Sequence, residues 1–485
     1  MSDPVQPGLT LKLIEPVVNA DIPWVDDALQ REQYATALTN LIDGEASPLV
    51  VSMNGTWGSG KTFFLKRWQA QLTKNGFKSI YFNAWEDDHC GDPLVAIIGQ
   101  LWNSLKDSDL KEIGKSIKKS AKPLLTKTVF NTVKVITGEI VDLNEKDLKN
   151  VAEQTVDDYF TTREQRDELK GRLNEMASKV AEKTKHPMIF IIDELDRCRP
   201  TFAIELLERV KHIFDIPNLV FVFGIDRRQL GGAIQSVYGN IDIDGYLRRF
   251  FDMELILPVC DSKLFCQHML KSHNLAKYFQ AKNEIAKSKI HTGEYTDFQN
   301  TFSLLAHRLR LSLRDIQHAI RSFVFVSKNL QDRQHMYPEL LAVLIILRIK
   351  NHELYTEYIK GQCLSAKVLD YIESFSPHDV SPFDRTNDTL DYIEVALYLS
   401  AYVGHAQKNI IREQLELLLK STPLISPDHL SQRTRNKSME DLSTFVAHYD
   451  HRLRNSTFES SIPTKQTIGY LVERIEMASM MIKDQ

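Results

Sequence analysis

Short apolar runs alternate with amphipathic stretches through the first half of the chain. Five runs rich in apolar and β-branched residues predict strands at residues 47–53, 78–85, 187–195, 218–226 and 250–258. Between them, stretches such as 26–42 and 92–105 carry apolar residues at helical spacing, the second with Asp92 as its expected cap and Pro93 in its first position. Strands separated by helices imply parallel pairing through crossovers. The pattern predicts an α/β fold with a five-stranded, mostly parallel sheet in a three-layer α/β/α arrangement.

The pattern changes twice along the chain. Between residues 106 and 185 strand signals disappear and apolar positions fall on one face of charged helices, which predicts a helical insert. After residue 258 we expect helices only, with a turn-rich break at 374–388. The α/β core should therefore comprise residues 1–105 and 186–260 on either side of the insert 106–185, followed by helical regions 261–330 and 331–485.

Composition and charge exclude several classes of protein. Lys and Arg total 60 against 64 Asp and Glu, a net charge of -4, so no overall basic field favours nucleic acid or anionic lipid. The five cysteines include no CxxC pair, which argues against a disulfide framework and a zinc site. We find neither a signal peptide nor an apolar run near the roughly 20 residues that span a bilayer. A cytoplasmic protein without membrane contact is expected.

A glycine-rich segment between the first strand and the next helix matches the spacing GxxxxGK[ST]. Glycines let backbone N–H groups converge on an anion, and the helix N-terminus adds positive potential. Lys61 should reach the terminal phosphates, and Thr62 should offer its hydroxyl to Mg²⁺. Trp57 is either a packing residue or a platform beside the nucleotide. The expected nucleotide-binding residues are Gly55, Thr56, Trp57, Gly58, Ser59, Gly60, Lys61 and Thr62.

An acidic pair ends the third predicted strand. Asp193 follows five apolar residues and is placed to hold Mg²⁺ through water. Glu194, beside it, is placed to orient and deprotonate the attacking water. Asp196 and Arg197 follow, and either serve the site or simply cap and pair within the turn. A phosphate loop upstream favours a functional role for the Asp193–Glu194 pair.

Further candidates follow the fourth strand and precede the fifth. Asp226 ends the fourth strand, where it is either polar machinery near the γ-phosphate or a helix cap. Arg248 and Arg249 are candidate arginine fingers for the nucleotide of a neighbouring subunit, or surface arginines. Arg314 lies on a later helix, where it could report the nucleotide state to the C-terminal half. The chain lacks the Asn-Lys-x-Asp element of a guanine site, so ATP is the expected nucleotide.

Together these segments resemble the KAP family of P-loop NTPases, in its bacterial, soluble form. The resemblance covers roughly residues 26–325 and rests on NGTWGSGKT, YFNAWEDD, IIDELDRCRP, LVFVFGIDRRQL and YLRRFFDMELILP. It implies the nucleotide and metal roles given above for Lys61, Thr62, Asp193 and Glu194. It also implies that the metal-binding strand lies beside the phosphate-loop strand, and that residues 261–330 form a lid containing Arg314.

One feature of many KAP members is missing from the pattern of this sequence. Many insert transmembrane helices between the two nucleotide motifs, whereas the corresponding segment here is interrupted by Lys127, Lys134 and Glu139. Membrane attachment is therefore not expected. Because bacterial relatives often occur in defence against phage, the resemblance also implies such a role, with an effector protein as partner.

The leading expectation is an ATPase whose turnover drives a conformational change, in a chain that forms homo-oligomers or engages an effector. Two alternatives stay open. In one, the chain is a slow nucleotide-gated switch or scaffold that controls assembly. In the other, it is a nucleic-acid motor or loader, supported by basic clusters at 111–127, 307–314 and 431–438, although such runs are usually solvated faces.

Overall fold

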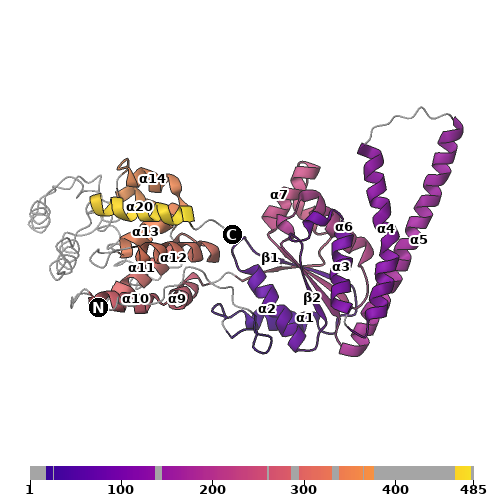
Figure 1. Ribbon diagram of the computed structural model, residues 1–485, viewed down its shortest axis with the longest axis horizontal. Helices are drawn as coiled ribbons and strands as arrows, with labels where there is room; N and C mark the ends of the chain where they lie inside the picture. Colours follow the sequence, from indigo (N-terminus) through magenta and orange to yellow (C-terminus); the bar gives the residue numbers. More distant parts are fainter. Residues whose placement is uncertain are drawn as a thin grey trace, which may run out of the picture. The chain divides into compact units, whose positions relative to one another are not determined.

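Five strands form one sheet in the first half of the chain (Figure 1). The computed structural model describes residues 18–25, 27–106, 108–136, 145–258, 261–285, 294–329, 338–363, 365–375 and 465–481. The strands are β1 (Leu49–Asn54), β2 (Ser79–Asn83), β3 (Met188–Asp193), β4 (Leu219–Ile225) and β5 (Met253–Ile256). Each overlaps one of the predicted runs, and all four pairings are parallel. The predicted parallel sheet is confirmed.

The order of the strands differs from the order that the family resemblance implies. Across the sheet it is β2-β3-β4-β1-β5, so β4 separates β3, which ends in Asp193, from the phosphate-loop strand β1. Gly224 of β4 lies opposite Met53 of β1 on one side and Asp193 on the other. The expectation that β1 and β3 are neighbours is wrong. Hydrophobic periodicity identifies a strand but carries no information about which strand lies beside it, because crossovers decide the order.

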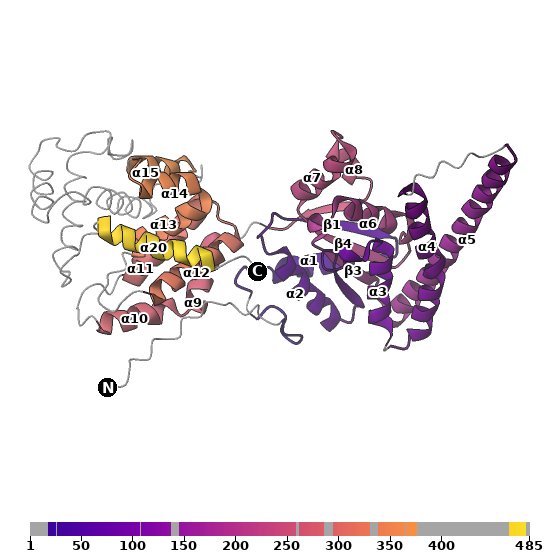
Figure 2. The ribbon, with the colours of Figure 1, turned by 45° about the horizontal axis from the view of Figure 1, so that its top comes forward.

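Helices cover both faces of the sheet (Figures 1 and 2). Side chains of one strand alternate between two cores, so that Phe190 and Phe221 enter one while Ile189 and Val220 enter the other. The first core is closed by α3 (Pro93–Leu105), α6 (Pro200–Ile213), α7 (Arg227–Tyr238) and α8 (Ile243–Leu247). The second is closed by α1 (Glu32–Ile42) and α2 (Lys61–Lys74). The sheet is thus the middle of three layers, as predicted.

Local hydrogen bonds set where the early helices begin. In α3 the Asp92 carboxylate accepts the N–H of Leu94 at 2.8 Å and Pro93 is the first residue, as expected. Helix α1 begins at Glu32, several residues later than the predicted start at 26. The carboxylate of Asp27 accepts backbone N–H groups of residues 29, 31 and 32 instead, which offers the backbone an alternative to helical bonding.

Two long helices, α4 (Lys111–Ile136) and α5 (Glu145–Thr184), make up the region predicted as a helical insert. They run side by side and extend beyond the sheet in both ribbon views (Figures 1 and 2). Near the sheet, Ile117 of α4 and Leu173 and Met176 of α5 are buried in the core with α3 and α6. The base of this pair is therefore anchored by apolar packing.

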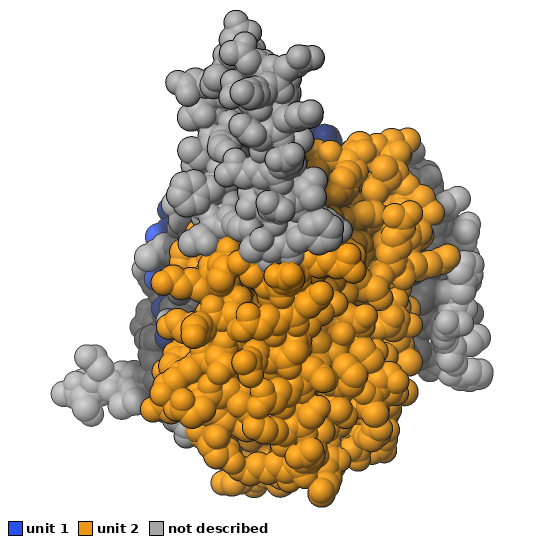
Figure 3. Space-filling model, turned by 90° about the vertical axis from the view of Figure 1, so that its right-hand side faces the viewer, with its two compact units in different colours: residues 1–16, 260–485 blue, residues 17–259 orange. Residues whose placement is uncertain are grey.

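The chain separates into two units, which we call the first unit (residues 17–259) and the second unit (residues 1–16 and 260–485); Figure 3 colours the first orange. In the second, the described residues form helices only: α9 (Ser262–Ser272), α10 (Leu275–Ile285), α11 (Glu294–Arg308), α12 (Leu313–Lys328), α13 (Pro338–Lys350), α14 (His352–Ile359), α15 (Ser365–Ser374) and α20 (Lys465–Met481). Most of the turn-rich segment 374–388 and the basic cluster 431–438 lie outside the described residues. The limits of the lid and C-terminal domain stay predictions. Among the described helices, none is long and apolar enough to cross a membrane.

Candidate nucleotide site

The glycine-rich segment forms the turn between β1 and α2, at the carboxyl edge of the sheet. Gly58 and Gly60 have φ angles of 76° and 85°, in the left-handed region that side chains disfavour. At Gly55 a Cβ atom would lie 2.8 Å from Ser59 Oγ and 3.1 Å from a side-chain carbon of Lys61, so a side chain here would displace both. Two glycines of the loop thus serve its conformation, and Gly55 leaves space for its neighbours.

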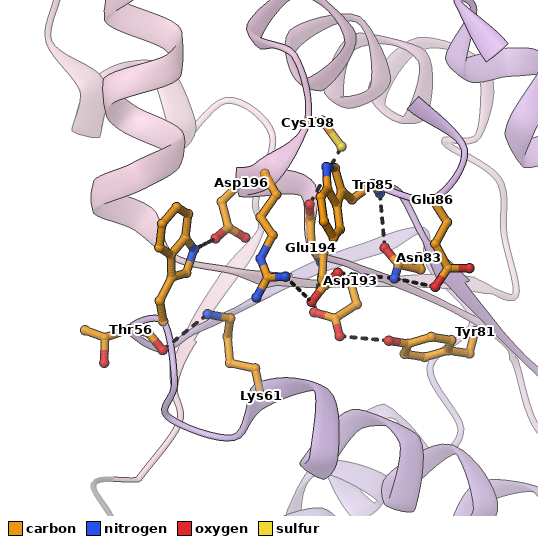
Figure 4. Close-up of polar contacts among 12 residues, drawn as sticks. Thr56, Lys61, Tyr81, Asn83, Trp85, Glu86, Asp193, Glu194, Asp196 and Cys198 are labelled. Atoms are coloured by element: carbon orange, nitrogen blue, oxygen red, sulfur yellow. Dashed lines mark hydrogen bonds and ion pairs between the residues drawn. The ribbon is translucent and has the colours of Figure 1, made fainter. Parts of the chain in front are cut away.

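Lys61 begins α2 and is largely buried. Its ammonium group donates hydrogen bonds to the carbonyl oxygens of Gly55 and, at 3.5 Å, Thr56, and Figure 4 shows it directed at the loop. Burial lowers the pKa of Lys61, because desolvation disfavours the charged form. Three carboxylates oppose that shift: Asp193, Asp196 and Asp226. The site thus holds a buried cation among acidic groups.

Asp193 ends β3 and is completely buried. Its carboxylate accepts a hydrogen bond from the Tyr81 hydroxyl at 2.9 Å (Figure 4). It also accepts hydrogen bonds from the N–H of Glu194 at 2.9 Å and from the Thr62 side chain. Burial raises the pKa of Asp193, and these hydrogen bonds act against the rise. The two predicted metal-binding residues, Thr62 and Asp193, therefore lie together although β4 separates β3 from the phosphate-loop strand β1.

Gly224 makes that contact possible. A Cβ atom on this residue of β4 would lie 2.7 Å from Asp193 Oδ1 and 2.5 Å from a methyl carbon of Leu65 on α2. Both separations are far below a normal van der Waals contact. The missing side chain leaves the space through which Asp193 reaches toward the phosphate-loop helix.

Glu194 follows in the left-handed region, with φ 61° and ψ 26°. For a residue with a side chain this conformation is uncommon, and such residues cluster at functional sites. Its Oε2 accepts a hydrogen bond from Asn83 Nδ2 at 3.2 Å, and its Oε1 pairs with Arg197 at 3.1 Å. Burial raises the pKa of Glu194, and the charge of Arg197 opposes this. Both carboxylate oxygens are thus held by partners from different segments.

Trp57 is joined to acidic residues that follow β4 and β3. Its backbone N–H donates to Asp226 at 3.0 Å, and its indole N–H donates to Asp196. Its side chain is 43% exposed, so it is not a core packing residue. Asp226 also accepts the N–H groups of Arg228 and Gln229 at the start of α7. Asp226 therefore caps α7 and also holds the phosphate loop. Its role near the γ-phosphate stays a prediction.

The remaining sequence candidates are arginines. Arg248 and Arg249 are exposed in the turn between α8 and β5. Arg314 is exposed as the second residue of α12, in the second unit. Their roles at a nucleotide stay predictions.

Sequence reasoning missed two parts of the site. Asn83 ends β2, and the rule that ligands meet strand ends would have found it from the same pattern that found Asp193. Arg31 is buried and donates hydrogen bonds to the carbonyl oxygens of Ser59, Gly60 and Pro258. It thereby ties the phosphate loop to the end of the fifth-strand segment. No local pattern marks it, because its partners are backbone groups far away in the sequence.

The chain is similar to the phage T7 exclusion protein of Escherichia coli (strain K12), with 24% identity over 198 residues, or 41% of this chain and 25% of that protein. It spans about a quarter of the length of that relative. Among solved structures it is similar to the Aeropyrum pernix ORC2 protein in ADPNP-ADP complexes, with TM-score 0.29, 12% identity and coverage of 93% of this chain and 95% of that one. Drosophila ORC bound to GC-rich DNA and Cdc6 gives TM-score 0.32, 13% identity and coverage of 100% and 70%. The KAP family P-loop domain matches residues 31–329, more than half of the chain, and the chain therefore belongs to the KAP family.

Proposed function

We propose that the chain binds ATP and hydrolyses it to ADP and phosphate, with Mg²⁺ as the metal. The observation that carries the proposal is the meeting of Lys61, Asp193 and Glu194 at one edge of the sheet, each held by named hydrogen bonds. Lys61 and the N–H groups of the loop would bind phosphate oxygens. Glu194 would accept the proton of the attacking water on its carboxylate.

The donor atoms near Asp193 suit Mg²⁺. A hydroxyl from Thr62 and a carboxylate from Asp193 are oxygen ligands, which this ion prefers. Burial raises the pKa of Asp193, and a divalent cation beside it would favour its ionised form. When bound, the ion would neutralise charge on the phosphates, and the two side chains would hold it directly or through water.

Two substitutions test the proposal. Lys61→Ala should reduce ATP turnover by about 100-fold or more, since it removes the positive charge that would bind the phosphate oxygens. Glu194→Gln should leave ATP binding within about twofold but lower turnover by about 100-fold or more, the size of a lost general base. Lys74→Ala, at the exposed end of the same helix, is the matched control and should behave as wild type. Wild-type turnover by Lys61→Ala would refute the central claim.

The same assay separates motor, switch and nucleic-acid functions. Repeated turnover well above about one ATP per minute would favour a driven conformational change. One round of hydrolysis followed by slow release of ADP would favour a nucleotide-gated switch. Stimulation by DNA or RNA with salt-dependent binding would favour a motor or loader. Exposed lysines of α4, including Lys111, Lys115 and Lys118, are where such binding would be sought.

Arg248 and Arg249 support a role between copies of the chain because both are exposed. We propose that one of them acts on the ATP of a neighbouring copy. Mixing Glu194→Gln protein with an Arg248→Ala, Arg249→Ala double variant should restore part of the turnover. At a mixed interface the double variant supplies an intact Glu194, and the Glu194→Gln copy supplies the arginines. No gain on mixing, from two variants that are each inactive, would argue against action between copies.

The name of one relative supports a role in excluding phage. We propose that a separate effector protein takes part in it. Bacteria that express the chain with its neighbouring genes should then form fewer T7 plaques than bacteria that express the Lys61→Ala variant. Equal plaque counts with both proteins present at the same level would argue against this role.

A further inference from the structure

Arg197 lies between two exposed tryptophan rings. Its guanidinium carbon is 5.9 Å from the ring centre of Trp57 and 5.5 Å from that of Trp85. Trp57 belongs to the phosphate loop, and Trp85 follows the end of β2. Their side chains are 43% and 52% exposed. A cation within about 6 Å of the centres of two indole rings is a favourable arrangement, which explains two large aromatic side chains at the surface of the site.

The same guanidinium group also reaches Glu194. An Arg197 nitrogen lies 3.1 Å from Glu194 Oε1, across the short turn formed by residues 195–197. Ion pairs three residues apart on a solvated helix contribute little. Here, however, the side chains are only 25% and 14% exposed. Arginine can stack its faces on rings while its edge pairs with a carboxylate, which the ammonium group of lysine cannot do.

Both tryptophans are themselves fixed by groups of the site. The Trp57 indole N–H donates to Asp196, next to Arg197 in the turn. The Trp85 backbone N–H donates to Asn83 Oδ1 at 3.1 Å, and Asn83 Nδ2 donates to Glu194 (Figure 4). The contacts thus link the phosphate loop to Arg197 through Trp57, and they link Arg197 to Glu194 directly. From Glu194 they continue through Asn83 to Trp85, whose ring contacts Arg197 again.

We propose that Arg197 is a positioning residue for hydrolysis: with its guanidinium over the rings of Trp57 and Trp85, it fixes the Glu194 carboxylate relative to the phosphate loop. The inference rests on the proposed function, in which Glu194 receives the proton of the attacking water. It assigns the two tryptophans a joint role. They hold the cation that holds the carboxylate, and thereby link the placement of the phosphates to the placement of the base.

The test compares kcat and KM for ATP in variants of the full chain. Arg197→Gln should lower kcat by about 10- to 100-fold, the cost of misplacing a reacting group by about an ångström, with KM within about twofold. Arg197→Lys should recover only part of the loss, because it restores the charge but not the stacking plane. Arg199→Gln is the matched control, since Arg199 pairs with Asp88 outside this set, and should retain wild-type kcat.

Trp85, the tryptophan outside the phosphate loop, provides a second pair of variants. Trp85→Phe keeps an aromatic face and should retain most of kcat, whereas Trp85→Ala should lower it in the direction of Arg197→Gln. A circular dichroism melt of each variant verifies that it is folded, so that a loss of kcat is not a loss of structure.

The outcomes separate the two proposals. Turnover by Glu194→Gln at the wild-type rate, or no turnover by the wild type, would overturn the proposed function. An active wild type, an inactive Glu194→Gln and a wild-type kcat in Arg197→Gln would overturn the role of Arg197 alone. A raised KM with unchanged kcat in Arg197→Gln would also overturn it, because Arg197 would then act in binding ATP.

Discussion

Gly224 is the residue on which the metal side of the site depends most directly. It stands in the strand that separates Asp193 from the phosphate-loop strand, and it faces both neighbours in register. Any side chain there would compete for the space of the Asp193 carboxylate and of Leu65. A single missing methyl group thus lets Asp193 of β3 meet Thr62 of α2 across the intervening strand β4.

Gly224→Ala should therefore damage both folding and activity. The added Cβ would force movement of Asp193 and Leu65, at a cost of about 1–3 kcal/mol in the free energy of unfolding. Any ATP turnover should fall further than stability alone explains. Gly232→Ala is the control, because it adds a Cβ with no atom within 4 Å in the interior of α7. It should be neutral or stabilising. Equal stability of the two variants would contradict the steric argument.

At the scale of elements, helix α9 is followed by a completely buried histidine, His273. Nδ1 of His273 lies 2.9 Å from the Met269 carbonyl oxygen, while Nε2 has no hydrogen-bond partner in the described structure. Burial lowers the pKa of His273 below 6.5, and the nearby positive charge of Arg321 acts in the same direction. The folded second unit therefore holds this side chain neutral where the unfolded chain would protonate it.

The second unit should lose stability in mild acid. The contribution of His273 is fully present above pH 6.5 and is lost as the pH falls from there toward the lowered pKa, by up to about 1.4 kcal/mol per pH unit. Between pH 7.5 and 5.5, His273→Leu should lose less stability than the wild type. Far-UV circular dichroism follows these helices, whereas all five tryptophans lie in residues 24–102 and report on the first unit. Equal losses in both proteins would contradict the prediction.

At the scale of the whole molecule, the groups that the structure brings together at the candidate site all belong to the first unit, whereas Arg314 belongs to the second. If α12 reads the nucleotide, as the sequence suggests, Arg314→Ala should lower ATP turnover by about tenfold through loss of one charge at the phosphates. Arg310→Ala, an exposed arginine just before the same helix, is the control and should be neutral. Steady-state turnover measures both. Equal rates would leave the second unit without a direct role at the nucleotide.

The sequence by itself determined the parts that depend on local chemistry. Gly58, Gly60, Lys61 and the cap at Asp92 were found from spacing, because loop geometry and helix capping involve residues a few positions apart. The three central strands were found from apolar runs, because burial on both faces leaves a local mark. The edge strands β2 and β5 are only partly buried and were found from the same kind of run. The predicted start of α1 was wrong because the side chain of Asp27 accepts hydrogen bonds from the backbone N–H groups of the residues that follow it.

Only the tertiary structure decided which distant segments meet. It placed β4 between β1 and β3, made Gly224 the gap that Asp193 reaches through, and brought Asn83 and Arg197 to opposite oxygens of Glu194. It also set the buried guanidinium of Arg31 against three backbone carbonyl oxygens. These contacts join residues up to 227 positions apart. Sequence periodicity does not predict these contacts, because it shows on which face of an element a side chain lies and not which distant residue packs against that face.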